Sequence, residues 1–271
     1  LPNFDEWIDD KVIKKYSFQN WNTSINFIHN PENLNDLVNK NIYRRRLAYD
    51  ELLAHQLAIA IIRNSNIKKK GLKFVPKSNL VKDFIKTLPF KLTKSQISAC
   101  ENIKNDLMSE NQMVRLLQGD VGSGKTIVSL ISMLSAVDSG FQAAIMVPTS
   151  ILASQHYENI DKLLKDFPIN ILLLTGKDKG KTRLQKNLLI KNGHAQIIIG
   201  THALIQDDVN FKTIGLVVID EQHRFGVFQR MAFSYKGVKP SILVMSATPI
   251  PRTLSLAAYG DMDESKITEK P

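Results

Sequence analysis

The hydrophobic positions follow two different patterns along the chain. Up to about residue 88, apolar side chains recur every three to four residues, which is the spacing of helices. The clearest case is YRRRLAYDELLAHQLAIAIIRN at residues 43–64, where Tyr49, Leu53 and Leu57 fall on one face. The pattern predicts that residues 1–88 are helical and that residues 43–64 form one long packed helix.

After Pro89 the apolar residues form short continuous runs between helical stretches. Continuous runs suit strands that are covered on both faces, and interleaved helices give βαβ units around a parallel sheet. The predicted fold class is therefore α/β, a mostly parallel sheet flanked by helices and preceded by an α-helical segment. The predicted strands are Val114–Gln118, Ala143–Val147, Ile169–Leu174, Gln196–Ile199, Leu216–Ile219 and Ile242–Met245.

Basic residues mark both ends of the predicted long helix. At its start, Arg44 to Arg46 either contact phosphates or form a solvated helix face. After it, the stretch NSNIKKKGLKF at residues 64–74 predicts an exposed polar linker that ends near Gly71.

Length and composition are those of an ordinary globular protein. With 271 residues, 43% hydrophobic and 23% charged, we expect one domain plus an attached segment. No run of about 18 apolar residues predicts a membrane span. The start at Leu1, without a basic-then-apolar leader, indicates a chain that begins inside a longer gene product. The single cysteine, Cys100, excludes an internal disulfide and favours the cytoplasm; we expect it to be a buried apolar residue.

Basic residues exceed acidic ones in this chain. Lysine and arginine number 36 against 26 aspartate and glutamate, which gives a net charge of +10. Such a surplus favours polyanions such as nucleic acid. A merely soluble surface explains the charge equally well.

A glycine-rich motif follows the first predicted strand. Residues 119–126 are GDVGSGKT and match the phosphate-loop pattern G-x-x-x-x-G-K-[ST], with an apolar-periodic helix after them. Glycines let the backbone curl so that N–H groups and the helix N-terminus face anionic oxygens. Lys125 is predicted to reach the β and γ phosphates, and the Thr126 hydroxyl to ligate Mg²⁺. The predicted nucleotide-binding residues of this loop are Gly119, Asp120, Val121, Gly122, Ser123, Gly124, Lys125 and Thr126.

A second motif, DEQH at residues 220–223, ends the fifth predicted strand. Its carboxylates emerge at the carboxyl edge of the sheet, where α/β folds bind ligands. Asp220 is placed to hold Mg²⁺ and Glu221 to orient and deprotonate the attacking water. Two acids after a strand are by themselves more often a solvated strand end, but the phosphate loop favours a catalytic pair. His223 is expected to link this site to the next motif, since no second His or Cys sits at metal-ligand spacing.

Three stretches, GDVGSGKT, DEQHRFGVFQR and SATPIPRTLSLAAYGDMD, resemble superfamily 2 helicase motifs. Together with RRRLAYDELLAHQLA they are similar to the RecG family of bacterial branch-migration helicases, ATP-dependent DNA translocases that remodel stalled replication forks and Holliday junctions. The likeness covers nearly the whole chain. It implies a RecA-like P-loop lobe at residues 89–271 and, at residues 1–88, a helical connection from a wedge domain. It also implies that Ser246 and Thr248 couple nucleotide state to DNA grip through His223.

The same resemblance implies base-reading and DNA-contacting residues. The segment FKLTKSQ at residues 90–96 resembles the part that receives adenine, with Gln96 reading the base. The segments VPTSILASQH, LLTGK and GTHALI resemble loops that touch the DNA backbone, and the family more often has Ser at the position of Lys177. Each polar side chain in these loops is equally well explained as a helix cap or turn former. The implied DNA-binding residues are Thr149, Ser150, Gln155, Thr175, Gly176, Thr201 and His202.

The family motor has two lobes with ATP between them, and the resemblance places the crossing into the second lobe near the end of this chain. The second lobe and the wedge domain are therefore expected outside residues 1–271. An arginine finger from a partner lobe is worth about 10³–10⁵ in turnover, so this piece alone is expected to hydrolyse ATP slowly. The expected partners are branched DNA and these two domains, with the whole protein acting as a monomer.

Three other functions stay open on the sequence. A transcription-repair coupling translocase shares SATPIPRT and would carry an RNA-polymerase-binding domain in place of the wedge. A nucleotide-gated module would grip nucleic acid without moving it. A small-molecule kinase would share the phosphate loop but would not need the Ser-Ala-Thr element. DNA-stimulated ATP hydrolysis by the intact protein separates a motor from the last two.

Overall fold

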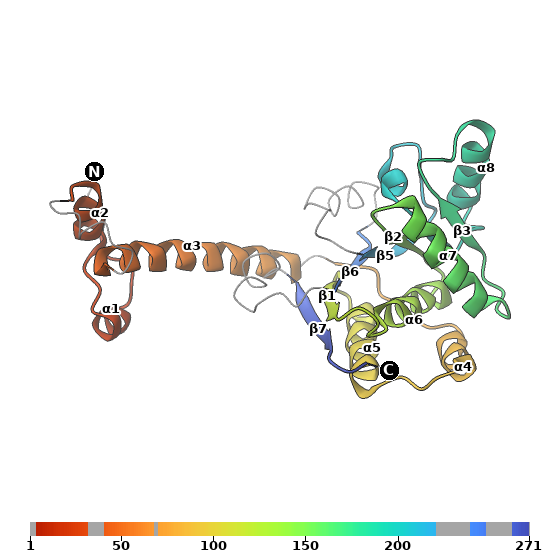
Figure 1. The fold of residues 1–271 in the computed structure, drawn as a ribbon, viewed down its shortest axis with the longest axis horizontal. Helices are drawn as coiled ribbons and strands as arrows, with labels where there is room; N and C mark the ends of the chain where they lie inside the picture. Colours follow the sequence, from red (N-terminus) through yellow and green to blue (C-terminus); the bar gives the residue numbers. More distant parts are fainter. Residues whose placement is uncertain (1–3, 32–40, 68–69, 221–238, 248–261, 271) are drawn as a thin grey trace.

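The computed structural model describes residues 4–31, 41–67, 70–220, 239–247 and 262–270. Its larger part is built on a seven-stranded parallel sheet with the order β3-β4-β2-β5-β6-β1-β7 (Figure 1). The predicted α/β class is confirmed, and each of the predicted strands is present. The strands are β1 (Val114–Gly119), β2 (Gln142–Met146), β3 (Ile171–Leu174), β4 (Ile197–Gly200), β5 (Ile214–Asp220), β6 (Ser241–Ser246) and β7 (Asp263–Ile267).

The described helices flank this sheet and precede it. Several begin with a side-chain cap that the sequence supplies, such as Asn20 before α2 and Thr149 before α7. The helices are α1 (Asp10–Tyr16), α2 (Trp21–His29), α3 (Ile42–Ile67), α4 (Leu80–Thr87), α5 (Lys94–Met108), α6 (Lys125–Asp138), α7 (Ser150–Leu164) and α8 (Gly180–Lys191), with a short 3-10 helix η2 (His202–Ile205). Among the described residues, no helix is long and apolar enough to cross a membrane.

The sheet is buried on both faces, which explains the continuous apolar runs. Successive side chains of a strand point to opposite faces. On β1, Leu117 packs in a core that includes residues of α5, α6 and α7, whereas Leu116 packs on the opposite face with Ile190 of α8. Both β1 side chains are at most 2% exposed. The strands inside the sheet therefore need apolar residues at consecutive positions, as doubly covered parallel strands do.

Strand β7 is present in the structure although the sequence pattern did not predict it. Its residues DESKI include three charged ones, and only Ser265 and Ile267 are buried. It pairs in parallel with β1 at the edge of the sheet. Arg115 of β1 donates to Ser265 Oγ at 2.9 Å and binds Asp106 of α5 at 2.7 Å. This segment is a strand because it pairs with β1 and is bonded by Arg115, and its own composition does not favour a strand.

Helix α3 is the predicted long helix, but the predicted packing of its apolar stripe is wrong. The helix continues to Ile67, so the first residues of the predicted linker are helical. Leu52, Leu57 and Ile61 are 65%, 54% and 68% exposed. Figure 1 shows why, because α3 projects away from the sheet with α1 and α2 at its far end.

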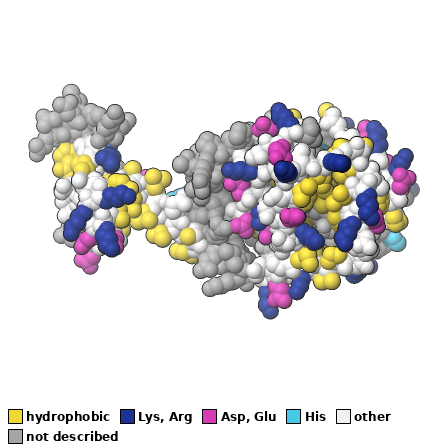
Figure 2. All heavy atoms as spheres, turned by 90° about the horizontal axis from the view of Figure 1, so that it is seen from below, with side chains coloured by type: hydrophobic (Ala, Val, Ile, Leu, Met, Phe, Trp, Pro, Cys, Tyr) yellow, Lys and Arg dark blue, Asp and Glu magenta, His cyan; other side chains and the backbone are white. Residues whose placement is uncertain are grey.

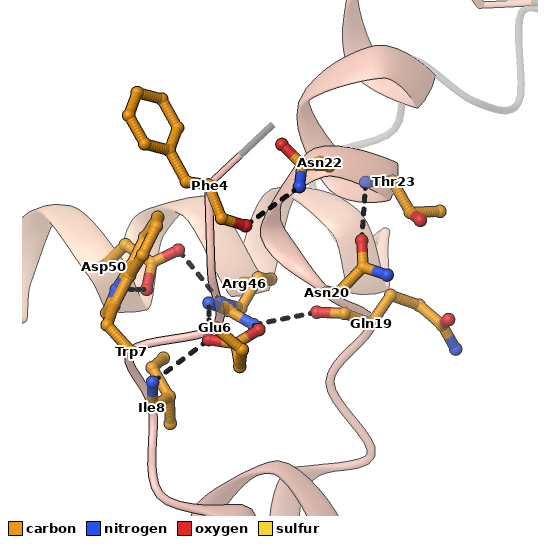
Figure 3. A network of polar contacts seen from close by, with 10 residues as sticks. All are labelled: Phe4, Glu6, Trp7, Ile8, Gln19, Asn20, Asn22, Thr23, Arg46 and Asp50. Carbon is orange, nitrogen blue, oxygen red and sulfur yellow. Dashed lines mark hydrogen bonds and ion pairs between the residues drawn. The ribbon is translucent and has the colours of Figure 1, made fainter. Parts of the chain in front are cut away.

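Arg46, near the start of α3, is fully buried in a polar network (Figure 3). Its guanidinium binds both oxygens of Glu6 at 2.7 and 2.8 Å and Asp50 at 2.9 Å. It also donates to the Gln19 carbonyl at 2.9 Å and lies over the Trp7 ring at 5.6 Å. The hydrogen bond from Arg46 lowers the pKa of Glu6. Neither predicted role, phosphate contact or solvated face, holds for Arg46; it fastens the first described residues to α3.

The packed body of the sheet domain begins before residue 89. Phe74 and Phe84 are buried in the same core as residues of α6 and α7, and α4 packs against α6. The predicted division between residues 88 and 89 therefore stays a prediction, and this packing favours an earlier boundary.

Cys100 on α5 is a partly buried free thiol that packs against the core. Burial, with a smaller contribution from Glu101, raises the pKa of this thiol to about 12. The thiolate is the reactive form, and an ordinary cysteine has a pKa of about 8.5. At pH 8 we expect Cys100 to react with a thiol reagent on the order of 10³-fold more slowly in the folded chain than in urea, with the rate rising about tenfold per pH unit. A folded-state rate within tenfold of the unfolded rate would contradict this protonation state.

Candidate active site

The phosphate loop, the acid of the second motif and Ser246 lie on three adjacent strands. Asp220 of β5 pairs with Met245 of β6, and Gln118 of β1 pairs with Ser246 of β6. Because the strands are parallel, their carboxyl ends share one edge of the sheet. That edge therefore carries the start of the phosphate loop, the buried Ser246 side chain and the Asp220 carboxylate side by side.

The phosphate loop follows a path that requires glycine. Gly122 and Gly124 have φ angles of +80° and +88°, the left-handed region that other residues rarely adopt. A Cβ on Gly124 would also collide with the amide of Gln96. Helix α6 starts directly after it, and Gly124 offers no side-chain cap to the first turn. The orphan N–H groups of a helix start form an anion site, so the loop and helix together provide a cradle for phosphate.

Lys125 reaches back across this loop. Its Nζ donates to the carbonyls of Gly119 at 2.5 Å and of Asp120 at 2.8 Å. These bonds hold a positive charge against the loop backbone, next to the start of α6. The predicted contact of Lys125 with phosphates is compatible with this position.

Gln96 connects the start of α5 to the phosphate loop. Its Oε1 accepts from the N–H of Thr93 at 2.9 Å in a capping box, and its Nε2 donates to the carbonyl of Ser123 at 2.8 Å. The side chain is 1% exposed. The T-x-x-Q spacing in residues 93–96 could have predicted the capping box, whereas the link to Ser123 needs the fold. An amide has two donor hydrogens and two lone pairs, and these two bonds use one of each; contact of Gln96 with adenine stays a prediction.

A residue with no assigned role in the sequence prediction contacts the second motif. His156 of α7 lies with Nε2 at 3.2 Å from Asp220 Oδ2, and the two side chains are 12% and 17% exposed. A carboxylate oxygen accepts hydrogen bonds, so Nε2 is the atom that can donate in this pair. The other predicted residues near this edge, Glu221, His223 and Thr248, lie outside the described residues.

The predicted DNA loops after β3 and β4 meet at one hollow. Gly176, Thr201 and His202 line a cavity of about 610 Å³ together with Gln206 and Asp207. The hollow lies at the same carboxyl edge, since Leu174 and Gly200 are paired in the last register of β3 and β4. The fold therefore brings together two of the segments implied by the helicase resemblance.

Two threonines of these loops also cap helices, which is the alternative role that the sequence left open for them. Thr149 accepts from Leu152 N–H at 3.3 Å, and Thr201 accepts from Ala203 N–H at 3.5 Å. Thr175 is buried, and its N–H donates to Asp178 at 2.8 Å. Gly176 and His202 are exposed, as is Gln155 on α7, while Ser150 is half-buried. DNA contact by any of these residues stays a prediction.

Ion pairs from α8 hold the two loops in place. Lys186 binds Asp178 at 2.6 Å, and although burial opposes it, this bond and those from Thr175 lower the pKa of Asp178. Arg183 binds Asp208 at 2.5 and 2.8 Å, which lowers the pKa of that carboxyl to about 2. Both carboxylates therefore stay charged at neutral pH, and the loops are fixed to a helix.

A larger cavity, of about 830 Å³, lies between α4, α5 and α6 and includes no phosphate-loop residue. Apolar side chains on this face are exposed between lysines (Figure 2). They include Phe90 and Ile97, which are 42% and 45% exposed, with Lys91 and Lys104 nearby in the lining. This cavity is not the phosphate cradle, but its end at Phe90 belongs to the segment predicted to receive adenine.

A parallel sheet with a phosphate loop, an acidic strand end and a serine on the strand between them defines a P-loop motor lobe of the RecA type. The family model for DEAD/DEAH box helicases matches residues 93–256, and the chain belongs to this family. It is 46% identical to the ATP-dependent DNA helicase RecG of Aquifex aeolicus over 99% of its length and 51% identical to that of Thermotoga maritima over 84%.

A solved structure described as RecG bound to a three-way DNA junction is also similar. The identity is 42%, the TM-score is 0.79, and the likeness covers 99% of this chain and 36% of that one. The chain spans 34% of the Aquifex aeolicus relative and 29% of the Thermotoga maritima relative. It therefore corresponds to about a third of such a protein.

Proposed function

We propose that this chain is the first motor lobe, with its helical connection, of an ATP-dependent DNA translocase that remodels replication forks and branched DNA. The observation that carries the proposal is the edge of the sheet at which the phosphate loop, Asp220 and Ser246 meet. The RecG relatives, matched along almost the whole chain, support it. The second lobe and the wedge domain would come from the rest of the protein.

The residues present fit a bound nucleotide. Two glycines with positive φ and a helix start without a side-chain cap form the cradle, and a Cβ at Gly124 would collide with the Gln96 amide beside it. In this proposal Lys125 binds the β and γ phosphates, and Thr126 and Asp220 would hold Mg²⁺. Mg²⁺, when bound there, neutralises charge on the phosphate oxygens. Glu221 orients and deprotonates the attacking water.

For the base, we propose that Gln96 reads adenine and that Phe90 offers an apolar wall. Gln96 already joins the phosphate loop through Ser123, so a base held by it would lie beside the phosphates. Phe90 lines the 830 Å³ cavity and is 42% exposed, and it belongs to the same segment, residues 90–96, as Gln96. Aromatic faces stack on bases with little dependence on sequence.

For DNA, we propose a backbone-directed track along the loops after β2, β3 and β4. Its members include Gly176 and His202, which share a hollow, and the start of α7 at Ser150. Contacts to phosphate carry no sequence information, which suits a motor that moves over arbitrary DNA. Binding of ATP would close the second lobe on this one, and hydrolysis would reopen the two lobes. The DNA-contacting loops would bind and release the duplex in turn, which would move it past the wedge domain. The protein acts as a monomer in the cytoplasm, which the single cysteine favours.

The test is ATP hydrolysis by the full-length protein with and without forked DNA, beside regression of a model fork. We expect strong stimulation by DNA and regression that depends on ATP. Stimulation by DNA without regression would favour a transcription-repair translocase. DNA binding that responds to nucleotide without stimulated hydrolysis would favour a binding module, and hydrolysis indifferent to DNA would remove the motor function.

A further inference from the structure

We infer that His156 positions the Asp220 carboxylate and transmits DNA contact at the start of α7 to the nucleotide site. The inference rests on the proposed function, in which DNA binds at the start of α7 and Asp220 holds Mg²⁺. Its basis is the hydrogen bond of 3.2 Å from His156 Nε2 to Asp220 Oδ2. This bond joins a helix that starts at the proposed DNA track to a strand that ends at the proposed metal site.

Burial gives this bond its orienting effect. The side chains of His156 and Asp220 are 12% and 17% exposed, so water competes weakly for either partner. A hydrogen bond to a charged group in such surroundings is stronger than one at the surface. Carboxylates that bind metals are themselves held by hydrogen bonds, and loss of such a partner typically costs about 10–100-fold in metal affinity or activity.

Helix α7 supplies the mechanical connection. It is one continuous helix of 15 residues, capped by Thr149, and its buried side includes Ala153 and Ile160. His156 is six positions after Ser150, which is about 9 Å along the helix axis. A DNA phosphate bound at the first turn would therefore act on the same rigid element that carries the imidazole. Because the bond joins α7 to β5, a small displacement of α7 relative to β5 would change its length.

The physical consequence is a selective effect on catalysis. His156 lies one contact away from the proposed metal ligand, so it is a positioning residue and not a catalytic one. Without its hydrogen bond the carboxylate samples more orientations, and DNA contact no longer improves its placement. We expect the turnover number in the presence of DNA to fall, while the Michaelis constant for ATP and the dissociation constant for forked DNA change by less than threefold.

Two substitutions in the full-length protein separate positioning from packing. His156→Phe keeps a flat ring of similar size and removes the donor, and His156→Gln keeps an N–H donor on a flexible chain. We expect His156→Phe to lower DNA-stimulated kcat by about 10–100-fold, and His156→Gln to restore it to within about fivefold of the unchanged protein. Glu158→Gln, an exposed position of the same helix, is the matched control and should leave kcat unchanged.

Thermal unfolding of each variant accompanies the kinetics. Equal DNA-stimulated kcat in His156→Phe and His156→Gln, whether both are retained or both lost, would overturn the inference. So would a loss in His156→Phe that is accompanied by proportionate losses of DNA and ATP affinity.

Asp220→Asn distinguishes failure of this inference from failure of the proposed function. If Asp220→Asn leaves ATP hydrolysis intact, the metal site itself is wrong. If Asp220→Asn abolishes hydrolysis while His156→Phe retains full DNA stimulation, only the positioning role is lost. When Asp220→Asn and His156→Phe are combined, their effects on kcat should not add, because both act through one carboxylate.

Discussion

Replacing Lys125 by alanine in the full-length protein is expected to lower ATP hydrolysis by at least about 10²–10³-fold and to abolish fork regression. Lys125 lies across the phosphate loop, with its ammonium on the carbonyls of Gly119 and Asp120. Removing one preorganised donor from a phosphoryl or oxyanion site typically costs about 2.7–4 kcal/mol of transition-state stabilisation. Steady-state hydrolysis with saturating forked DNA measures the effect.

Lys104→Ala is the matched control for that experiment. Lys104 is an exposed lysine of α5 in the lining of the separate 830 Å³ cavity, so its removal changes the net charge equally. We expect hydrolysis within about twofold of the unchanged protein. Full fork regression by Lys125→Ala would refute the assignment of phosphates to this loop.

Replacing Arg46 by methionine is expected to destabilise the unit formed by α1, α2 and the start of α3 by about 3 kcal/mol. The substitution keeps much of the apolar stem but leaves Glu6 and Asp50 without the cation that binds both. Removing one partner of a buried ion pair typically costs about 3–5 kcal/mol, and we take the lower value because the Glu6 side chain is 26% exposed. Denaturant unfolding of the 271-residue chain measures the loss.

Tryptophan fluorescence isolates this unit during unfolding. Trp7 and Trp21 are the two tryptophans of the chain; their rings lie 5.7 Å apart, and Arg46 lies over the Trp7 ring. The exposed neighbour Arg45→Ala should change the free energy of unfolding by less than about 0.5 kcal/mol. Because Arg46 lowers the pKa of Glu6, its stabilising effect is present above the unfolded pKa of Glu6 and is lost as pH falls through the lowered one. An Arg46→Met chain with unchanged stability at pH 7 would contradict a structural role.

Local pattern was sufficient to predict the strands that are covered on both faces. Short runs of mostly apolar residues between helical stretches, such as Ala143–Val147, are typical of strands in a doubly covered sheet. Strand β7 lacked such a signal, because three of its five residues are exposed and its buried Ser265 accepts a hydrogen bond from Arg115 of the neighbouring strand. Helix α3 differs, because its periodic pattern predicted the helix correctly but did not predict that its apolar side chains are exposed.

For the candidate site, the motif spelling indicated which residues matter and the topology decided their neighbours. Glycines at 122 and 124 are required by local backbone geometry, so the phosphate loop could be recognised without a structure. His156 and Asp220 are 64 residues apart and could be joined only by the packing of α7 near the end of β5. In the same way, Arg46 belongs to a basic run in the sequence, and Glu6, the carboxylate that binds it, lies 40 residues away.

The sequence by itself determined the class of fold, the positions of its main strands along the chain and the phosphate loop, because periodicity and glycine chemistry act over a few residues. Only the tertiary structure decided that Gln96 clamps the loop, that α3 extends away from the sheet and that His156 holds Asp220. Those features depend on contacts between residues that are far apart in the sequence. Such contacts form only after folding has closed the intervening loops, so no local pattern announces them.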